Sequence, residues 1–336
     1  MSDSPLASPG VPAEVLAFLR EYDTYYIVGH VEPDGDCLAS SLALGSYLER
    51  HLNKRTRLYN AGPFERREIV SLENRFQPRL DADDRAGDSR PAVIILDCSG
   101  PSRVGSLESD IEGLPVAVID HHATNTAYGD ARFVVPTAPA TCYLVQLVME
   151  ALGGGITTEE AELLLFGIAT DTGYFRHAEA DAADLFAGVS RLMAAGASPK
   201  RTHGRMFGGH TLASRQLLAT LLARAEPIAG GAGVITYETL EDTERFGRTS
   251  RDSDTLYQLL FGIDGLRTAA LLREERDVTV SGSLRSIDAI DVSAIAQRFG
   301  GGGHKRAAGF TAPLALDDAL QRVRSELERA LRSDET

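Results

Sequence analysis

The sequence predicts an α/β protein with a mainly parallel sheet in its amino-terminal half and a smaller α/β domain after it. Short apolar runs alternate with helix-like stretches between residues 25 and 195, and this alternation is typical of βαβ units. Acidic and His residues follow several of these runs directly, where the carboxyl ends of parallel strands commonly form a site. After about residue 227 the spacing of apolar residues changes, which indicates a second domain.

In the first half, runs rich in Val, Ile, Leu and Tyr predict strands, and apolar residues at helical spacing predict helices. The expected strands are Tyr25–Gly29, Thr56–Asn60, Ala92–Leu96 and Pro115–Ile119. The expected helices are Leu38–Leu52, Ala140–Leu152, Glu159–Ala169 and Asp181–Ala195. The charged stretch Asp81–Arg90 is expected to form a loop.

In the second half, Gly196–Gly209 contains Pro199 and several basic residues and predicts a break, followed by a connecting helix at Thr211–Glu226. Strands are then expected at Gly233–Glu238, Arg267–Arg273 and Asp277–Leu284, and helices at Ser253–Phe261, Val292–Phe299 and Leu314–Leu331. The chain therefore divides into a loose tail (1–12), a first domain (13–195), a linker with the connecting helix (196–226) and a second domain (227–336).

Length and composition are those of a globular protein. A chain of 336 residues fits two domains, with 43% hydrophobic and 24% charged residues. The formal net charge of −14 argues against a broad footprint for long DNA, which needs a basic face, but not against a short anionic substrate. No apolar run is long enough to cross a bilayer, and Met1–Pro12 lacks an export signal, so no membrane association is expected.

The three cysteines, Cys37, Cys98 and Cys142, are widely spaced and form neither a disulfide framework nor a C-x-x-C pair. A reducing, cytoplasmic location fits them best. Cys37 and Cys98 each follow a candidate metal ligand directly. We favour packing over ligation for both, because cysteine is commonly buried as a small apolar residue.

The first chemical motif is His30-Val31-Glu32-Pro33-Asp34-Gly35-Asp36, directly after a predicted strand. Pro33 and Gly35 favour a tight turn that brings Asp34 and Asp36 into one small volume with His30. Hard divalent ions take carboxylate oxygens, and an imidazole adds preference for manganese, iron or zinc. The alternative is a polar loop in which Asp36 only caps the following helix.

Three further motifs follow apolar segments. Asp97 follows Val93–Leu96, the triplet Asp120-His121-His122 follows Val116–Ile119, and Asp171 follows Leu163–Ala169. Charged groups beside buried segments are costly unless something pairs with them. One explanation is that all four segments end at one edge of a sheet, where carboxylates and imidazoles surround divalent ions. Surface histidines in a loop, and a carboxylate standing alone at a strand end, are the plainer alternatives.

The last motif is Gly300-Gly301-Gly302-Gly303-His304, with Arg285 and Ser286 at the end of an upstream strand. Consecutive glycines allow backbone N–H groups to approach a ligand closely, and a helix starting after them would attract an anion. Arg285 offers a guanidinium to a phosphate. The alternative is a plain glycine linker, which the structured-looking sequence on both sides disfavours.

Together these motifs resemble the DHH phosphoesterase superfamily, whose name matches Asp120-His121-His122, and the Gly-Gly-Gly-His stretch resembles its DHHA1 domain. The order and length resemble the compact, NrnA-type branch, which degrades nano-RNA and dephosphorylates 3′-phosphoadenosine 5′-phosphate (pAp). The resemblance spans about Tyr25 to Phe310. It implies a catalytic DHH domain, a substrate-binding DHHA1 domain and an active site in the cleft between them.

The resemblance also implies roles for individual residues around two divalent ions, usually manganese. His30, Asp34 and Asp97 would hold one ion. The other would be held by Asp36, Asp97, His121 and Asp171, with Asp97 bridging. The implied catalytic residues are His122, against the scissile phosphate, and Asp120, behind a histidine. The residues implied to bind the far end of the nucleotide are Arg285, Ser286, Gly301, Gly302, Gly303 and His304.

The expected reaction is hydrolysis of short oligoribonucleotides such as pApA, or of pAp, to nucleoside monophosphates by a water that two metal ions activate. A cyclic di-AMP phosphodiesterase would use the same metal site, and the sequence does not separate the two. An inorganic pyrophosphatase is disfavoured by the Gly-Gly-Gly-His domain, and a non-catalytic nucleotide sensor by the presence of every expected ligand. The expected partners are short RNA or small nucleotides, and a homodimer is left open.

Overall fold

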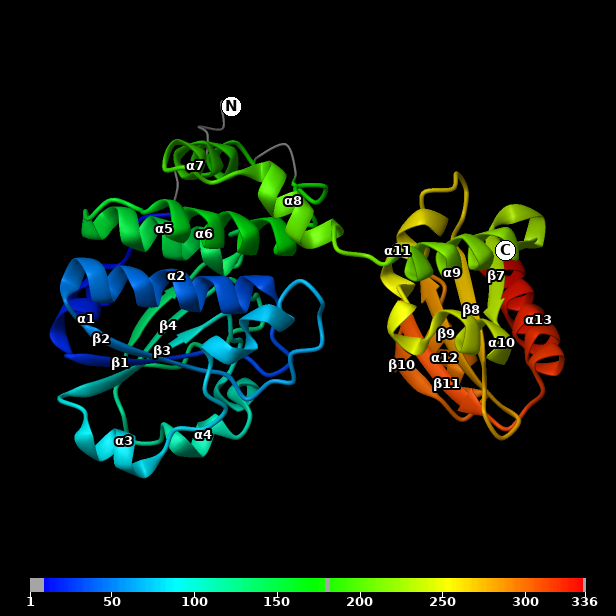
Figure 1. Ribbon diagram of the computed structural model, residues 1–336, viewed down its shortest axis with the longest axis horizontal. Helices are drawn as coiled ribbons and strands as arrows, with labels where there is room; N and C mark the ends of the chain where they lie inside the picture. Colours follow the sequence, from blue (N-terminus) through cyan, green and yellow to red (C-terminus); the bar gives the residue numbers. More distant parts are fainter. Residues whose placement is uncertain (1–8, 179–181, 335–336) are drawn as a thin grey trace. The chain divides into compact units, whose positions relative to one another are not determined.

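The computed structural model describes residues 9–178 and 182–334. The chain divides into two compact units, Met1–Gly208 and Gly209–Thr336, and each has its own sheet and core (Figure 1). The predicted class is confirmed: a parallel sheet with helices forms the first unit, and a mixed sheet with helices forms the second. None of the described helices combines the length and apolarity that crossing a bilayer requires.

The first unit is built on a parallel sheet in the strand order β2-β1-β3-β4-β5. The strands are β1 (Thr24–Val28), β2 (Arg55–Tyr59), β3 (Pro91–Leu96), β4 (Val116–Asp120) and β5 (Ala131–Val134). The first four match the expected strands closely. The apolar runs of β1, β3 and β4 are buried on both faces, whereas β2 is partly exposed and only Tyr59 is buried. The short strand β5 was not predicted.

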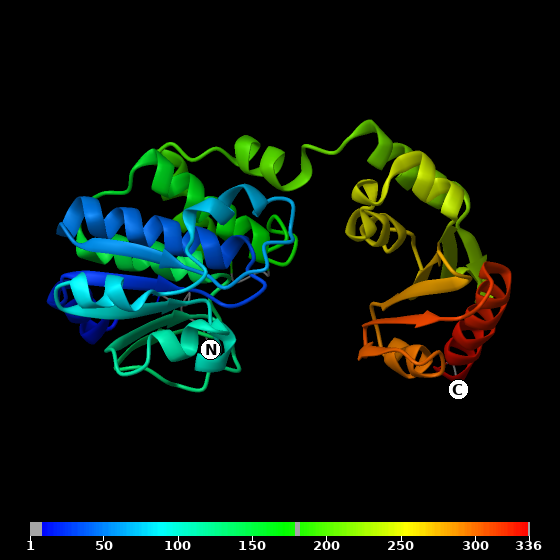
Figure 2. The ribbon, with the colours of Figure 1, turned by 60° about the horizontal axis from the view of Figure 1, so that its bottom comes forward.

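Two layers of helix cover this sheet (Figures 1 and 2). Side chains alternate along each strand, so Tyr25 and Ile27 join the larger core while Tyr26 and Val28 join the smaller one. The larger core is formed with α1 (Ala13–Glu21), α2 (Gly35–Leu52), α5 (Thr141–Leu152), α6 (Thr158–Asp171) and α7 (Ala183–Ala194). The smaller core is formed with the turns around α4 (Leu107–Asp110); α3 (Ala82–Gly87) lies on this side.

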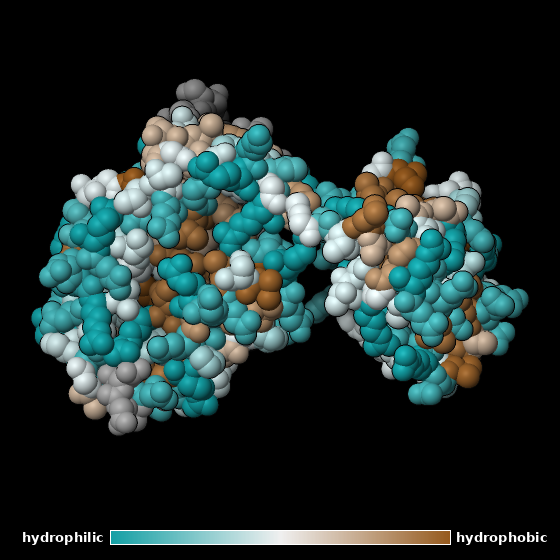
Figure 3. All heavy atoms as spheres, viewed as in Figure 1, coloured by the Kyte–Doolittle hydropathy of each residue, from teal (hydrophilic) through white to brown (hydrophobic). Residues whose placement is uncertain are grey.

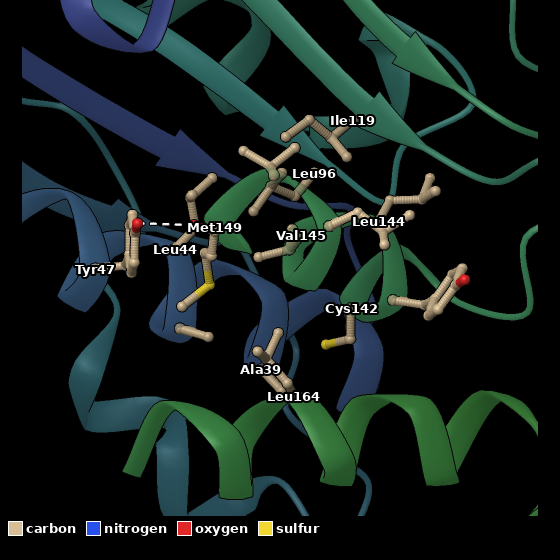
Figure 4. Close-up of a cluster of buried hydrophobic side chains, with 14 of the residues drawn as sticks. Ala39, Leu44, Tyr47, Leu96, Ile119, Cys142, Leu144, Val145, Met149 and Leu164 are labelled. Carbon is tan, nitrogen blue, oxygen red and sulfur yellow. Dashed lines mark hydrogen bonds between the residues drawn. The ribbon is translucent and has the colours of Figure 1, made fainter. Parts of the chain in front are cut away.

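Helix α5 lies between the sheet and α6, and its apolar side chains contact both (Figure 4). Leu144 and Val145 pack with strand residues such as Leu96, whereas Cys142 lies on the α6 side. The hydroxyl of Tyr47 in α2 donates to the backbone oxygen of Met149 at 2.7 Å, which ties α2 to the end of α5. Tight packing therefore fixes the helices on this face of the sheet, including α2, which carries Asp36 near its start, and α6, which carries Asp171 at its end.

Close packing of α5 on α6 depends on Gly167. A Cβ atom at this position would lie 2.2 Å from the sulfur of Cys142 and 3.0 Å from Oδ1 of Asp36. Contacts this short cannot be kept, so the helices would have to separate.

Three sequence expectations are corrected in this unit. The hypothesis that all four apolar segments end at a sheet edge holds for three of them: Leu163–Ala169 lies inside α6, as the helix expected at Glu159–Ala169 indicates, and Asp171 is the last residue of that helix. The predicted break at Gly196–Gly209 contains α8 (Pro199–Phe207), because Pro199 occupies the first helical turn, where it costs no hydrogen bond. The expected loop Asp81–Arg90 contains the short helix α3.

The second unit contains a mixed sheet in the order β10-β11-β9-β8-β7-β6, in which β7 and β8 pair in parallel and the other neighbours are antiparallel. Its strands are β6 (Glu226–Ile228), β7 (Gly233–Glu238), β8 (Thr268–Glu275), β9 (Thr279–Ser286), β10 (Gly302–His304) and β11 (Ala307–Ala312). Its helices are α9 (Leu212–Ala223), α10 (Leu240–Phe246), α11 (Ser253–Leu260), α12 (Val292–Gln297) and α13 (Leu316–Asp334). Helix α9, expected as a connection, packs into the core of this unit.

The glycine motif was expected to precede a helix, but it does not. Gly302–His304 forms the edge strand β10, which turns back into β11. Two of the glycines are needed for this hairpin, because a Cβ on Gly301 would lie 2.2 Å from the oxygen of Gly309 and a Cβ on Gly303 would lie 2.6 Å from that of Ala307. Strand packing therefore explains these glycines without a ligand.

Replacing Gly167 by Ala should destabilise the fold by about 1–3 kcal/mol, because the new methyl group overpacks the α5–α6 contact. Urea denaturation measures the free energy of unfolding. Gly204→Ala is the matched control: it also lies in a helix, but its Cβ would meet open space, so it should be neutral or stabilising by up to about 1 kcal/mol. Equal effects of the two substitutions would contradict the packing argument.

Candidate functional site

The His and Asp residues of the first unit meet at the carboxyl edge of its parallel sheet. His30 follows β1, Asp97 follows β3, and Asp120 ends β4. The start of α2 adds Asp34 and Asp36. The end of α6 adds Asp171, which lies 3.2 Å from His121. The structure thus brings the four amino-terminal motifs together, three of them from strand ends and the fourth from a helix end.

Asp97 lies at the centre of this group and is 2% exposed. One carboxylate oxygen lies 3.5 Å from Nε2 of His30, and the other lies 3.5 Å from Nε2 of His121. Its backbone has a φ of +58°, a left-handed conformation that non-glycine residues adopt only occasionally, aspartate and asparagine more often than most. Strained backbone of this kind persists where the surrounding structure enforces it, and it is frequent at functional sites.

Asp36 is fully buried, and its carboxylate faces the start of α5. The backbone N–H groups of Thr141 and Cys142 donate to its two oxygens at 2.6 and 2.8 Å. A helix amino terminus favours negative charge. Burial nevertheless raises the pKa of Asp36 well above its ordinary value, and the charges of Asp97 and Asp171 raise it further.

His30 and Asp34 form the other side of the group. Nδ1 of His30 lies 2.8 Å from the backbone oxygen of Val31, so Nδ1 carries the proton and Nε2 is free to accept or ligate. That Nε2 lies 3.9 Å from Asp34. Asp34 caps α2 by accepting from the N–H groups of Asp36 and Cys37. Burial opposes its ionisation, but the contacts with His30 and these backbone donors bring its pKa down to about 2.

His121 is held in the same manner, since its Nδ1 lies 3.1 Å from the backbone oxygen of Ala138. Its free Nε2 faces Asp171 and Asp97. Burial raises the pKa of Asp171 to about 6, and although His121 lowers it, the charges of Asp97 and Asp34 add to the increase. In each histidine a backbone carbonyl fixes the tautomer that points the second nitrogen into the site.

His122 differs from the other two histidines because its Nδ1 is bound by a carboxylate. Oδ1 of Asp120 accepts from this nitrogen at 2.7 Å, and Nδ2 of Asn125 donates to Oδ2 of Asp120 at 2.7 Å. The hydrogen bond between His122 and Asp120 raises the pKa of His122. Burial opposes ionisation of Asp120, but the bonds from His122 and Asn125 hold its pKa below the ordinary value. The imidazole side chain is 42% exposed, so Nε2 can reach a substrate.

The donor set fits divalent cations. Three overlapping groups have ligand atoms within 4.8 Å of one another: His30 with Cys37 and Asp97, Asp97 with His121 and His122, and Asp36 with His121 and Asp171. Asp97 is shared by two of these groups and His121 by two, which suits a pair of neighbouring ions. Burial raises the pKa values of Asp36 and Asp171, and the charges of the neighbouring carboxylates raise them further, so a bound cation would stabilise their ionised forms.

The groups contain one residue that we assigned to packing. The sulfur of Cys37 lies close to His30 and Asp97, while Nδ2 of Asn60 approaches the same sulfur at 3.9 Å. Burial raises the pKa of this thiol, which disfavours the thiolate that a metal needs. Gly29 also packs against the sulfur. We therefore retain Asp34 rather than Cys37 as the expected partner of His30.

The candidate substrate-binding residues of the second unit lie along one row of its sheet. Arg285 of β9 pairs with Ala307 of β11, which pairs with His304 of β10. Directly paired residues project from the same face of a sheet, so Arg285 and His304 share a face and only a small alanine separates them. The guanidinium of Arg285 lies 5.1 Å from the centre of the Tyr257 ring, and His304 is exposed.

Ser286 is placed apart from this row. As the next residue along β9 it projects from the opposite face, where it is buried. Its hydroxyl donates to Asp288 at 3.2 Å. Of the three glycines predicted to bind substrate, Gly301 and Gly303 lie against β11, whereas a side chain at Gly302 would meet open space. Gly302 therefore leaves the most room for a ligand at the backbone.

Sequence reasoning missed several residues that complete the site. Thr141 donates from its hydroxyl to Asp97 at 3.0 Å and from its backbone to Asp36. Arg66 lies 3.7 Å from Asp34, and Asn125 orients Asp120. Thr141 lies 44 residues from Asp97 and 105 from Asp36, and Arg66 is also far in sequence from Asp34, so no local pattern revealed these contacts. Asn125 stands three residues after the triplet and was the one most open to detection.

Comparisons with known proteins agree with this geometry. Residues 24–168 match the model of the DHH family, N-terminal domain, and residues 234–332 match the DHHA1 domain. A protein of Thermus thermophilus named bifunctional oligoribonuclease and PAP phosphatase NrnA is 33% identical over 91% of this chain and 90% of its own. The protein of the same name from Bacillus subtilis is 25% identical over 96% of this chain and 99% of its own.

A solved structure has the same fold. The exopolyphosphatase-related protein of Bacteroides fragilis superposes with a TM-score of 0.74 and 20% identity, covering 95% of this chain and 96% of its own. At that identity the likeness concerns the fold alone. With both family models matched and a relative 33% identical along nearly its whole length, the chain belongs to the DHH family of phosphoesterases and carries a DHHA1 domain.

Proposed function

We propose that this protein is a metal-dependent phosphoesterase that hydrolyses short oligoribonucleotides and pAp to nucleoside monophosphates. The observation that carries the proposal is the position of Asp97, with one oxygen toward His30 and the other toward His121. A carboxylate placed this way can bridge two cations. The names of the two nearly full-length relatives supply the substrate class.

We assign the ligands as the family resemblance implies them. His30, Asp34 and Asp97 would hold one ion, and the second would be held by Asp36, Asp97, His121 and Asp171. Mixed carboxylate and imidazole donors suit manganese, which we propose as the metal. Bound cations would supply an activated water and neutralise charge on the phosphoryl group. Thr141 holds Asp97 in position and the start of α5 holds Asp36.

His122 is proposed to serve as the proton donor. Its Nδ1 donates to Asp120, so the exposed Nε2 carries a proton only when the imidazole is protonated, and that proton can pass to the leaving oxygen or stabilise a phosphoryl oxygen. Asp120 keeps the ring in this tautomer and favours its protonated form, as Asn125 in turn fixes Asp120. The pair resembles the carboxylate–histidine arrangement that other hydrolases use to orient an acid or base.

The second unit is proposed to bind the non-reacting part of the nucleotide. Arg285 can form a bidentate contact with a terminal phosphate, and His304 on the same face adds a further donor. Gly302 leaves room for close approach to the backbone. The proposed role of Ser286 is weaker, because its hydroxyl is engaged by Asp288.

Cyclic di-AMP hydrolysis is the second candidate. Relatives named cyclic-di-AMP phosphodiesterase match at 23–24% identity, and this chain spans less than half of their length. Their lower identity favours the first proposal. A substrate panel of pApA, pAp, cyclic di-AMP and pyrophosphate with manganese, resolved by chromatography, tests the choice: pApA and pAp should be consumed fastest. Turnover confined to cyclic di-AMP or pyrophosphate would reject it.

Substituting Asp97 by Asn should abolish turnover of both pApA and pAp. The expected loss exceeds 100-fold, since even groups that only orient metal ligands cost roughly 10–100-fold when changed. Asn is chosen because it tolerates the left-handed backbone at this position. Glu108→Gln, at an exposed site, is the charge-matched control. Full manganese-dependent activity of the Asp97 variant would exclude the bridge.

Substituting Asp120 by Asn should lower the pKa of His122, because the hydrogen bond from His122 to this carboxylate is what raises it. If protonated His122 is needed, the rate falls as pH rises through its pKa. The alkaline limb of the pH–rate profile should therefore move to lower pH in the variant, with kcat reduced roughly 100-fold or more. An unshifted limb with a normal kcat would show that His122 is not the acid.

The thermal stabilisation by Mn²⁺ should grow with pH between about 4 and 7. The pKa of Asp171 is about 6 in the fold against 3.8 ordinarily, so the metal-free fold loses stability as pH rises through this window. A cation displaces the proton, and the difference in Tm with and without Mn²⁺ should be small at low pH and full near pH 7. The Asp171→Asn variant should show a weaker dependence of this Tm difference on pH. In the wild-type protein, a Tm difference that does not change with pH would contradict the prediction.

A further inference from the structure

A cavity of about 490 Å³ opens beside Asp171, and all the residues that line it belong to the first unit. The loop after β5 forms one wall, and α5, α7 and the turn after α6 form the others. Ala138 joins the cavity to the metal group, because it lines the cavity and its backbone oxygen also accepts from His121. Neither the family models nor the names of the relatives assign a role to this cavity.

The lining is mostly apolar. Val135, Pro139, Tyr143 and Leu185 contribute hydrocarbon and an aromatic ring, and the carboxylates of Asp171 and Asp184 lie at its borders. No Lys or Arg is present among the described residues that line it. A phosphate group would be repelled here, whereas a neutral, flat group could pack against the walls.

The turn that closes the cavity is held in an unusual conformation. Gly173, Tyr174 and Phe175 have φ values of 57°, 58° and 69°, which for two of them is a strained, left-handed backbone. Several hydrogen bonds hold the turn. Among them, the His177 N–H donates to the backbone oxygen of Thr172 at 3.2 Å, and the Tyr174 hydroxyl donates to that of Pro199 at 2.8 Å. This conformation brings Thr172 and His177 into the cavity wall directly after the proposed ligand Asp171.

We propose that this cavity holds the second nucleoside of a short oligonucleotide, the one joined through its O5′ to the scissile phosphorus. The proposal rests on the proposed function, since it places the reacting phosphorus at the metal group beside Asp171. A nucleoside carries no charge of its own, which matches a lining whose described residues include no Lys or Arg. The volume falls within the range of small-molecule sites.

The chemistry of the two proposed substrates makes the inference testable. In pApA and in pAp alike, a water oxygen bonds to phosphorus, the P–O3′ bond breaks, and O3′ receives a proton. With pApA the phosphorus leaves as the 5′-phosphate of the second nucleoside, and with pAp it leaves as inorganic phosphate. Only pApA therefore has a second nucleoside that could occupy the cavity.

The test is to fill the cavity with Thr137→Trp, whose side chain is exposed on the loop after β5 at the rim. The ratio kcat/KM for pApA should fall roughly tenfold or more, as expected for a blocked apolar pocket, while that for pAp is unchanged. Ala187→Trp, exposed on α7 and outside the lining, should change neither. Ala178→Phe fills the cavity from another wall and replaces the first variant if that one does not fold.

Each result has a defined meaning. Selective loss of pApA turnover with a retained Tm supports the nucleoside site. Equal losses for both substrates, or no loss for either in a folded variant, overturn it. If the wild-type enzyme with manganese hydrolyses neither substrate, the proposed function itself fails, which is a separate outcome from failure of the cavity.

Discussion

Repulsion among buried carboxylates is the constraint on which this site depends. Asp36 and Asp97 are almost fully buried, and Asp34 and Asp171 complete a group of four at one edge of the parallel sheet. Backbone N–H groups at the starts of α2 and α5 compensate part of the charge. The raised pKa values of Asp36 and Asp171 show that the compensation is incomplete. Divalent cations are the natural complement, and the fold keeps their ligands apart from bulk water and in place.

The fold holds this group through packing that lies behind it. Helix α5 presents its amino terminus to Asp36 and its Thr141 hydroxyl to Asp97, and it is clamped between the sheet and α6 (Figure 4). Gly167 allows this close packing because its lack of a side chain lets α6 approach Cys142 of α5. By contrast, hydrophilic side chains cover much of the face seen in Figure 3, in keeping with a net charge of −14. Under the proposed function, affinity for an anionic substrate would come from bound cations and from the proposed contacts of a few residues such as Arg285.

The sequence was most informative where local pattern and buried chemistry coincide. Strands β1, β3 and β4 are predictable from their apolar runs. The His or Asp at or just after the end of each run also predicts that these polar side chains meet at one edge of the sheet. Strand β5 was missed because Ala131–Val134 is short and contains Arg132, and α8 because Pro199 suggested a break. The glycine motif was assigned to a helix start because glycine's freedom at a turn looks the same before a helix or a hairpin. Thr141 and Arg66 depend on contacts between distant segments, which a single sequence does not reveal.

The central claim is that separate segments converge on a pair of cations that share Asp97. Crystals grown with Mn²⁺ and measured at the manganese absorption edge test it most directly, since anomalous scattering locates each ion without reference to activity. The account predicts two peaks, each within bonding distance of an oxygen of Asp97, one beside His30 and the other beside His121. Manganese absent from this edge of the sheet, or bound there without Asp97, would contradict it.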